Sequence, residues 1–457
     1  MVYAVRQTRE VMAPVLSRLR KIAGVVGLGA VLALIAAEPS LAADDVTITV
    51  DFANAVKPVK AIAGGFLGSL DETYPPDNRI APLKPRIWKS NYLWSEEEGA
   101  NWVLYDRIVR FGAVPQFPLD EPWKATYAGK PCEDWNLWAL YVKPKAQDFA
   151  SHGKSPEWIV WGEPNATWSW LDSCTQNDYY VAYKIAFDAI RREIPLAQIG
   201  GPALADYEDW ESVKDWIVGL LDFCLANDCE VNFITWHEYT DHNVTSIGDR
   251  LAEIKGIASN SVYGPLNIRN YYIGEIIGGD GQYSPGHAVV TFYNLERGGA
   301  TGAAKACWPV PGPGECDYNS LDGLLTQGPN YGRRSIWWAY ERYALHSGFW
   351  VQAATTNPAV AALASSDPSV SRKRVLVGYS GPAEPAGDAR KINLVLNNLG
   401  PGTDRAVKIH YIPSTDQMPL PGPSLMSEGR RAVVSGRMLI TLDSFQPNHA
   451  FEVVIDP

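Results

Sequence analysis

The stretch Trp158-Ile-Val-Trp-Gly-Glu163-Pro-Asn165 joins a short apolar run to a single acidic residue. An apolar run of this length, bounded by glycine and proline, is typical of a buried strand followed by a turn. The strand is therefore predicted to deliver the carboxyl group of Glu163 into that turn. Burying a carboxylate without a partner or a purpose is costly, so Glu163 is a candidate functional residue.

A second stretch, Tyr271-Tyr-Ile-Gly-Glu275-Ile-Ile, has the same form. An apolar strand carries one carboxyl group at its end, and Gly278-Gly279 lie beyond it. Each glutamate alone could be an ordinary salt-bridge residue. Two of them in matching settings favour a functional pair instead.

Between about residue 60 and residue 345, short apolar runs alternate with amphipathic stretches, of which 178–193 and 210–226 are the clearest. This alternation predicts parallel strands joined by helices. The strands are expected at 61–67, 86–88, 113–117, 158–161, 198–201, 231–237, 271–276 and 305–308. They indicate a closed (β/α)8 TIM barrel, which we place at residues 59–348.

After residue 349 the pattern changes to alternating apolar segments separated by glycine, proline, asparagine and aspartate. This pattern predicts an antiparallel β-sandwich domain at 349–457. The early alternating stretch within 44–58 is expected to add a strand to the same sheets. The chain is thus α/β, with the sandwich tied to both ends of the mature protein.

The first 43 residues have the order of a signal peptide. Arg18, Arg20 and Lys21 precede an apolar run at 22–37, and small residues follow at 41–43. The run is short for a membrane span, and an uncleaved anchor is the alternative. We expect export to the periplasm or the medium, with no stable span after cleavage. The formal net charge of -11 disfavours nucleic acid as a partner.

The chain has an even set of six cysteines, which agrees with export. Several pairings are possible. We favour three bridges, because short loops close readily and the remaining two cysteines then pair by elimination. They are Cys132 with Cys174, Cys224 with Cys229 and Cys307 with Cys316. The alternative, six buried thiols, fits an oxidising compartment less well.

Paired carboxyl groups at strand ends suit one kind of chemistry. Residues at the carboxyl ends of barrel strands face the active site, so Glu163 and Glu275 point into one bowl. Glycoside hydrolysis needs one protonated and one ionised carboxyl group. The apolar, tryptophan-rich surroundings of Glu163 favour its neutral form. We expect a retaining hydrolase without a cofactor, with Glu275 as nucleophile and Glu163 as acid/base.

The motif Trp-Gly-Glu-Pro-Asn at 161–165 resembles the Trp-Asn-Glu-Pro-Asn acid/base motif of clan A glycoside hydrolases. The chain is most similar to glycoside hydrolase family 39, the β-xylosidase and α-iduronidase family. The resemblance extends to 236–239, Glu275, 324–326 and the aromatic helix 337–343, so it covers most of 60–350. The family's asparagine before the acid/base contacts the sugar's 2-hydroxyl. Here it is Gly162, which puts the usual recognition of xylose or uronic acid in question.

Further residues near the predicted strand ends could complete the site. His237 and Tyr239, after the sixth strand, are expected beside the catalytic pair. For each residue the alternative is plain packing or structural support. The candidates for substrate contact are Lys89, Asn91, Gln116, Asn165, Trp168, Trp170, His237, Tyr239 and Trp308.

The same residues allow two other interpretations, a metal site and a non-catalytic protein. His237 and His242 lie five residues apart after a strand, instead of four apart on one helix face, so no metal is expected. A non-catalytic carbohydrate-binding protein on the same barrel is the alternative function, and Gly162 is the feature that supports it. The expected partner is an extracellular or periplasmic oligo- or polysaccharide, either plant hemicellulose or a bacterial exopolysaccharide.

Overall fold

The computed structural model describes residues 45–119, 129–205, 209–239, 244–307, 320–326, 330–381 and 389–457. They belong to one compact unit, Ala43–Pro457. The predicted signal peptide, residues 1–43, lies outside the described residues. Within the described part, no helix is long and apolar enough to cross a membrane.

Eight parallel strands form a closed barrel in the order β2, β3, β6, β7, β8, β9, β10 and β11. Their bounds are Gly65–Leu67, Ile87–Lys89, Val114–Pro118, Glu157–Ile159, Ile199–Leu204, Phe233–Glu238, Asn270–Ile276 and Gly302–Lys305. The predicted TIM barrel is therefore confirmed. The eighth strand was misplaced, since it ends at Lys305 and not at residue 308.

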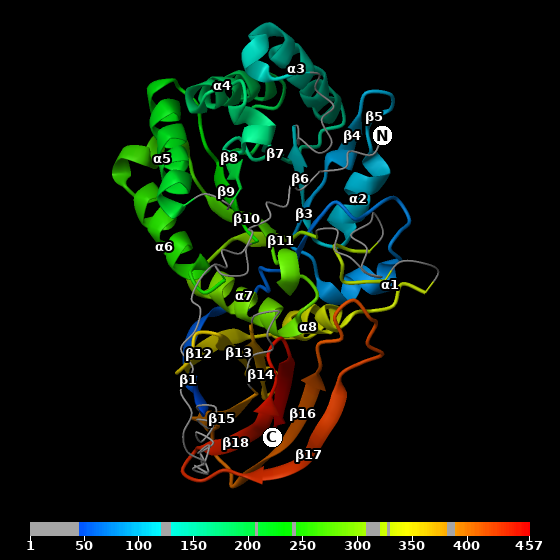
Figure 1. Cartoon of the computed structure of the whole chain (residues 1–457), viewed down its shortest axis with the longest axis vertical. Helices are drawn as coiled ribbons and strands as arrows, with labels where there is room; N and C mark the ends of the chain where they lie inside the picture. The colour runs from blue at the N-terminus through cyan, green and yellow to red at the C-terminus, as the bar shows by residue number, and fades with distance from the viewer. Residues whose placement is uncertain are drawn as a thin grey trace, which may run out of the picture. The chain divides into compact units, whose positions relative to one another are not determined.

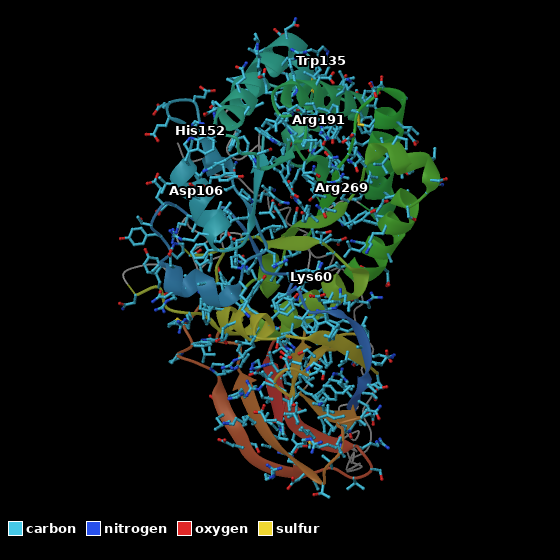
Figure 2. The ribbon with its side chains drawn as sticks, turned by 180° about the vertical axis from the view of Figure 1, so that it is seen from behind. Lys60, Asp106, Trp135, His152, Arg191 and Arg269 are labelled. Atoms are coloured by element: carbon cyan, nitrogen blue, oxygen red, sulfur yellow. A yellow bond between two sulfur atoms is a disulfide. The ribbon has the colours of Figure 1, made fainter. Side chains whose placement is uncertain are left out.

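Helices follow the barrel strands and surround them (Figure 1). They are α1 (Asp77–Ile80), α2 (Trp102–Arg110), α3 (Trp135–Ser151), α4 (Gln176–Glu193), α5 (Trp210–Ala226), α6 (Ile247–Ala258), α7 (Pro285–Gly298) and α8 (Ser335–Ala344). The start of α4 shows why a helix begins there. Thr175 accepts from the backbone of Asp178, whose side chain accepts from Thr175 N, a capping box. Figure 2 shows Asp106, on α2, and Trp135, at the start of α3, on the outside.

A separate nine-stranded sheet has the order β17, β16, β19, β14, β13, β12, β1, β15, β18. The strands are β1 (Val46–Pro58), β12 (Phe349–Thr355), β13 (Val360–Asp367), β14 (Arg372–Tyr379), β15 (Arg390–Asn397), β16 (Asp404–Ile412), β17 (Ser424–Ala432), β18 (Met438–Phe445) and β19 (Ala450–Asp456). A β-sandwich beside the barrel is thus confirmed. It is mixed and not wholly antiparallel, because β1 pairs with β15 in parallel.

The strand that precedes the barrel lies inside this sheet, between β12 and β15. Val46, Ile48 and Val50 of β1 are buried, and the residues between them are more exposed. That period of two is the one expected of a strand with one buried face. The beginning and the end of the described chain therefore share one β core.

Candidate active site

Glu163 lies in the loop that follows β7, the fourth barrel strand, and is 1% exposed. Its φ is 51°, and that of Trp161 is 62°, so both residues adopt the left-handed conformation that side chains disfavour. A hydrogen bond from Glu163 N to Ala203 O, 2.9 Å long, ties the loop to β8. Strained backbone of this kind clusters at functional sites, where the surrounding structure holds it in place.

Ser169 braces the same loop from within. Its hydroxyl donates to Gly162 O at 2.8 Å and accepts from the indole nitrogen of Trp161 at 3.0 Å. Ser169 belongs to a π-helical turn, η5 (Thr167–Leu171), a rare element that is frequent at functional sites. The backbone directly before Glu163 is therefore fixed by a buried side chain.

Asn165 also fixes the loop. The sequence suggested a contact with substrate for this residue, whereas the structure shows contacts with the backbone. Its amide nitrogen donates to Ala205 O at 3.0 Å, and its oxygen accepts from Ala205 N at 2.9 Å. The side chain is 2% exposed. Both ends of the amide are thus engaged with the backbone after β8, and we assign Asn165 a positioning role.

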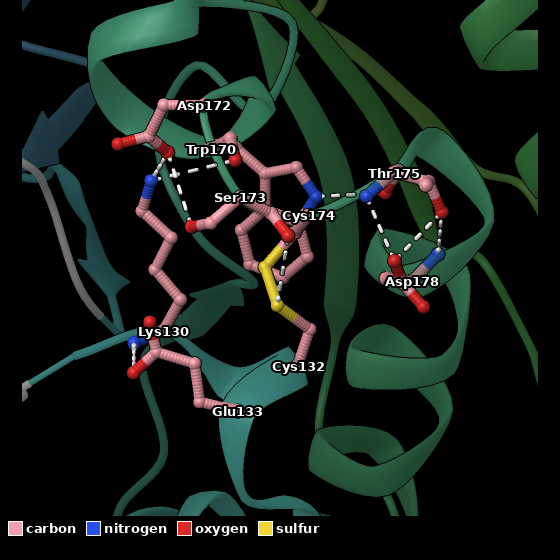
Figure 3. Close-up of a disulfide and its surroundings, with 9 residues drawn as sticks. All are labelled: Lys130, Cys132, Glu133, Trp170, Asp172, Ser173, Cys174, Thr175 and Asp178. Carbon is pink, nitrogen blue, oxygen red and sulfur yellow. Dashed lines mark hydrogen bonds and ion pairs between the residues drawn. A yellow bond between two sulfur atoms is a disulfide. The ribbon is translucent and has the colours of Figure 1, made fainter.

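A disulfide between Cys132 and Cys174 closes the segment beyond η5 (Figure 3). Beside it, Lys130 forms an ion pair with Asp172, and the indole of Trp170 donates to Thr175 O at 2.8 Å. These contacts join the start of α3 to the start of α4. The loop that carries Glu163 is consequently held at both of its ends.

The other predicted bridges have different outcomes. Cys224 and Cys229 are bonded, as predicted, at the end of α5. Cys307 is disulfide-bonded as well, but its predicted partner Cys316 lies outside the described residues.

Glu275 lies on β10, the seventh barrel strand, and is 1% exposed. The register between β9 and β10 shifts between Ile273 and Glu275, which sets Glu275 beside His237. Gly274 occupies the shift. A Cβ there would meet Thr235 Oγ1 at 3.0 Å and His237 Cδ2 at 3.1 Å, so the ring of His237 uses the space that glycine leaves.

The two glutamates share His237. Its Nδ1 lies 2.8 Å from Glu163 Oε1 and 3.7 Å from Glu275 Oε2. Lys89, on β3, brings its ammonium to 3.3 Å from Glu275 Oε1, and its side chain is 1% exposed. In so dry a site this cation favours the ionised form of the carboxylate beside it. Lys89 thus supports Glu275, where the sequence also allowed a substrate contact.

Glu163, His237 and Glu275 each offer one atom, and these three atoms lie within 4.8 Å of one another. The spacing could hold a metal ion. The ammonium of Lys89 already supplies positive charge to Glu275, which makes the site less attractive to a cation. The arrangement suits proton transfer and nucleophilic attack by carboxylates.

The remaining predicted residues divide into three groups. Asn91, the first residue of the turn η2 (Asn91–Leu93), and Tyr239, whose ring centroid lies 6.1 Å from that of His237, are partly exposed near the strand ends. Gln116 instead donates to Glu157 at 2.8 Å and is buried, so it does not serve as a substrate contact. Trp308 lies outside the described residues.

The predicted sugar platforms behave differently from each other. Trp170 is fully buried and packs against Trp161 with ring centroids 5.2 Å apart. Its role is structural. Trp168 is 48% exposed.

Sequence reasoning missed Ser169 and Gly274. A glycine directly before a strand glutamate was a usable signal, because glycine inside a strand often marks a bulge or a close approach. Ser169 offered no such signal. Its role depends on the π-helical turn, which the local sequence does not predict.

Fold and site together define a class of protein. A closed barrel with two buried glutamates, one in the loop after its fourth strand and one on its seventh strand, has the paired carboxyl groups that glycoside hydrolysis requires. Residues 136–261 match Glycosyl hydrolases family 39. A β-xylosidase of Geobacillus stearothermophilus is 30% identical over 162 residues, 31% of this chain and 31% of that protein. The match thus spans about a third of that relative's length.

Solved structures share the whole architecture. N2152 from Neocallimastix frontalis superposes with a TM-score of 0.73 at 19% identity, covering 90% of this chain and 100% of that one. The GH39 enzyme of Xanthomonas axonopodis pv. citri gives 0.63 at 17% identity, covering 93% and 100%. These likenesses show the fold. Residues 136–261 are thus similar in sequence to glycoside hydrolase family 39.

Proposed function

We propose that the protein is a retaining glycoside hydrolase that acts on an oligo- or polysaccharide outside the cytoplasm. The observation that carries the proposal is the buried pair Glu163 and Glu275, which offer oxygens within 4.8 Å of each other. Retaining enzymes hold their carboxyl groups ~5–5.5 Å apart, whereas inverting enzymes leave ~6.5–9.5 Å for a water molecule. The short separation therefore supports double displacement.

The reaction has two steps. Glu275 attacks the anomeric carbon as Glu163 donates its proton to the leaving oxygen, so the glycosidic bond breaks and a glycosyl ester forms on Glu275. Glu163, now ionised, takes a proton from water. The resulting hydroxyl attacks the anomeric carbon and releases the carboxylate of Glu275 with net retention.

Two neighbours prepare these states. Lys89, 3.3 Å from Glu275, stabilises the carboxylate before attack and after release. His237 lies within hydrogen-bond distance of Glu163, and so holds the acid/base in place through its change of charge. Neither residue needs to exchange a proton with the sugar.

Substrate and location are inferred from the relatives and from the sequence. The similarity to a β-xylosidase favours a hemicellulose-like glycan, with a bacterial exopolysaccharide as the alternative. The signal-peptide order of residues 1–43 and the disulfide bridges support export to the periplasm or the medium.

The test compares Glu275→Gln and Glu163→Gln on a panel of aryl glycosides. We expect Glu275→Gln to lower kcat by roughly 10⁴-fold or more. Glu163→Gln should cost ~10²–10⁴-fold with poor leaving groups and much less with good ones, which need no proton. NMR of the first product should show the retained anomer.

Glu157→Gln is the matched control. Glu157 lies on β7, the strand that leads to Glu163, and its buried carboxyl group accepts from Gln116 and Tyr272 and not from the catalytic pair. We expect near wild-type turnover. An inverted first product, or equal losses from Glu163→Gln for all leaving groups, would contradict the assigned roles. Glycan binding without turnover by the wild type would favour the binding-protein alternative.

A further inference from the structure

Among the described residues, three aromatic side chains are strongly exposed: Tyr74 at 47%, Trp168 at 48% and Phe349 at 44%. Two of them occupy loops that follow barrel strands, and Phe349 belongs to the sheet domain. An exposed tryptophan or tyrosine leaves a large apolar surface in contact with water. Such residues often mark binding surfaces.

Trp168 lies directly beyond the loop of Glu163. Its neighbour Ser169 is 2% exposed and bonded to Gly162 O, and Trp170 is fully buried. The turn is therefore anchored directly after the exposed indole. Trp168 follows Glu163 by five residues, in the segment between β7 and α4 that also carries the acid/base.

Tyr74 belongs to a second aromatic surface. Its ring stacks on that of Tyr331, with centroids 5.8 Å apart and planes at 23°. Tyr74 lies in the loop between β2 and α1, and Tyr331 precedes α8. The pair therefore joins the loops that follow the first and the last barrel strands.

This surface is held firmly. Arg107 is 2% exposed and donates to Tyr74 O at 3.1 Å and to Asp71 O at 2.7 Å. Asp71 Oδ1 accepts from Tyr74 N at 2.6 Å. On the other loop, Arg79 Nε donates to Tyr331 O at 3.0 Å. A buried arginine and an aspartate turn thus preorganise a tyrosine pair that solvent can reach.

The strand order sets these two surfaces on opposite sides of the barrel. β7, which leads to Trp168, is the fourth strand of the ring, and β11 and β2, which lead to the tyrosines, are the eighth and first. Figure 1 shows α4 and α8, the helices after these loops, on opposite sides of the strands. Both loops lie at the carboxyl ends of the strands, as the catalytic pair does.

The chemistry gives the two sides different roles. Glu163 protonates the leaving oxygen, so we assign Trp168, which lies in the same segment after β7, to the side of the leaving group. The tyrosine pair then lies on the side of the sugar that is attacked. Flat apolar faces on both sides fit a chain of sugars whose rings stack on aromatic side chains.

We propose that the protein binds an extended, neutral, β-linked glycan across its C-terminal face, from Trp168 to Tyr74 and Tyr331, and cleaves it internally. The inference rests on the proposed hydrolase function for the cleavage, and on the aromatic surfaces for the binding. An acidic protein, with a formal net charge of -11, suits a neutral chain better than an anionic one.

Binding is tested in the Glu275→Gln variant, which should hold a chain without cutting it, by calorimetry with xylohexaose and cellohexaose. We expect Trp168→Ala and Tyr74→Ala each to raise the Kd roughly 10-fold, the cost of one aromatic anchor. Phe349→Ala, the exposed aromatic on β12, is the matched control and should leave the Kd unchanged. Circular dichroism verifies that each variant is folded.

An unchanged Kd in both Trp168→Ala and Tyr74→Ala, or no binding of either hexasaccharide, would overturn the proposed glycan surface. The early products of the wild type test internal cleavage separately from glycan binding and from hydrolysis as such. Di- to tetrasaccharides would support internal cleavage. Monosaccharide as the sole early product would overturn internal cleavage, while the proposed glycosidase function would stand. Binding without turnover of any glycoside would overturn the hydrolase and keep the surface.

Discussion

Glycine at position 162 removes a side chain from the point where the family's asparagine contacts the sugar. Hydrogen bonds to the 2-hydroxyl strengthen toward the oxocarbenium-like transition state and contribute several kcal/mol. The backbone at Gly162 is still fixed, because its carbonyl accepts from Ser169. The missing contact is thus a chemical difference, and the loop keeps its shape.

We therefore expect poor cleavage of simple aryl β-xylosides by the wild type and a preference for a larger or substituted glycan. Gly162→Asn should raise kcat/KM on aryl β-xyloside by roughly 10-fold or more, because the amide restores the contact made in the transition state. Steady-state kinetics of both proteins measure this. Efficient wild-type cleavage with no gain in the variant would show that position 162 carries no specificity.

At the scale of the element, the bulge between β9 and β10 sets the active-site spacing. Gly274 gives the ring of His237 its room, with a Cβ position only 3.1 Å from Cδ2 and 3.2 Å from Nε2. Any side chain at this position pushes the imidazole away from its place beside Glu163 and Glu275. The bulge thus acts on catalysis through His237.

Gly274→Ala should lower kcat by roughly 10–100-fold and leave KM nearly unchanged, since the displaced His237 no longer holds Glu163 for proton transfer. Gly256→Ala is the matched control, because this helical glycine in α6 has open space at its Cβ. It should keep full activity and stabilise the fold by about 0.5–1 kcal/mol. Equal kcat values in Gly274→Ala and the wild type would contradict the positioning role.

The elements differ in how far the sequence predicts them. Helix α5 begins and ends where its apolar spacing predicted, at Trp210 and Ala226. Most residues of the edge strand β17 are exposed, so no period of two marks this strand in the sequence. The eighth strand was predicted three residues late. Its true residues, 302–305, are small apart from Lys305 and lack the branched side chains that signal a strand.

The site shows the same division. Glu163, His237 and Glu275 were predicted to lie close together, because residues at the carboxyl ends of parallel barrel strands face one site. The same rule made Asn165 a candidate for substrate contact, and the structure shows its amide bonded to backbone. Its partner, Ala205, lies 40 residues away on the next strand's loop, and only the folded chain reveals that contact.

At the scale of the whole molecule, two histidines join barrel helices to the sheet domain. His287 Nδ1, on α7, lies 2.9 Å from Ser380 Oγ, and His346 Nδ1, after α8, lies 2.7 Å from Ser365 Oγ. Both imidazoles are 4% exposed. Burial lowers the pKa of His287 to about 4, helped by Lys305.

Burial likewise lowers the pKa of His346 to about 3; nearby Arg374 also lowers it, while Glu452 opposes the shift. Both histidines therefore stay neutral in the folded protein at pH values where an unfolded histidine, with a pKa of ~6.5, is already protonated. The junction between barrel and sheet domain carries two groups that resist protonation as long as the protein is folded.

The sign of the resulting pH dependence follows from proton binding. Below pH ~6.5 the unfolded chain binds more protons at these two positions than the folded one, so the free energy of unfolding falls as the pH falls toward 4. His287→Asn/His346→Asn keeps an oxygen that can accept from each serine but cannot titrate. Urea unfolding at pH ~7.5 and ~4.5 should show that the free energy of unfolding falls less at acid pH in this variant than in the wild type.

His152→Asn, at an exposed histidine after α3, is the control, and its free energy of unfolding should fall as much as that of the wild type. Carboxylates away from the junction titrate in all three proteins, so the difference between them reports on the buried histidines and on the carboxylate of Glu452 that interacts with His346. Equal acid losses in the double variant and the wild type would show that the junction does not sense pH through them.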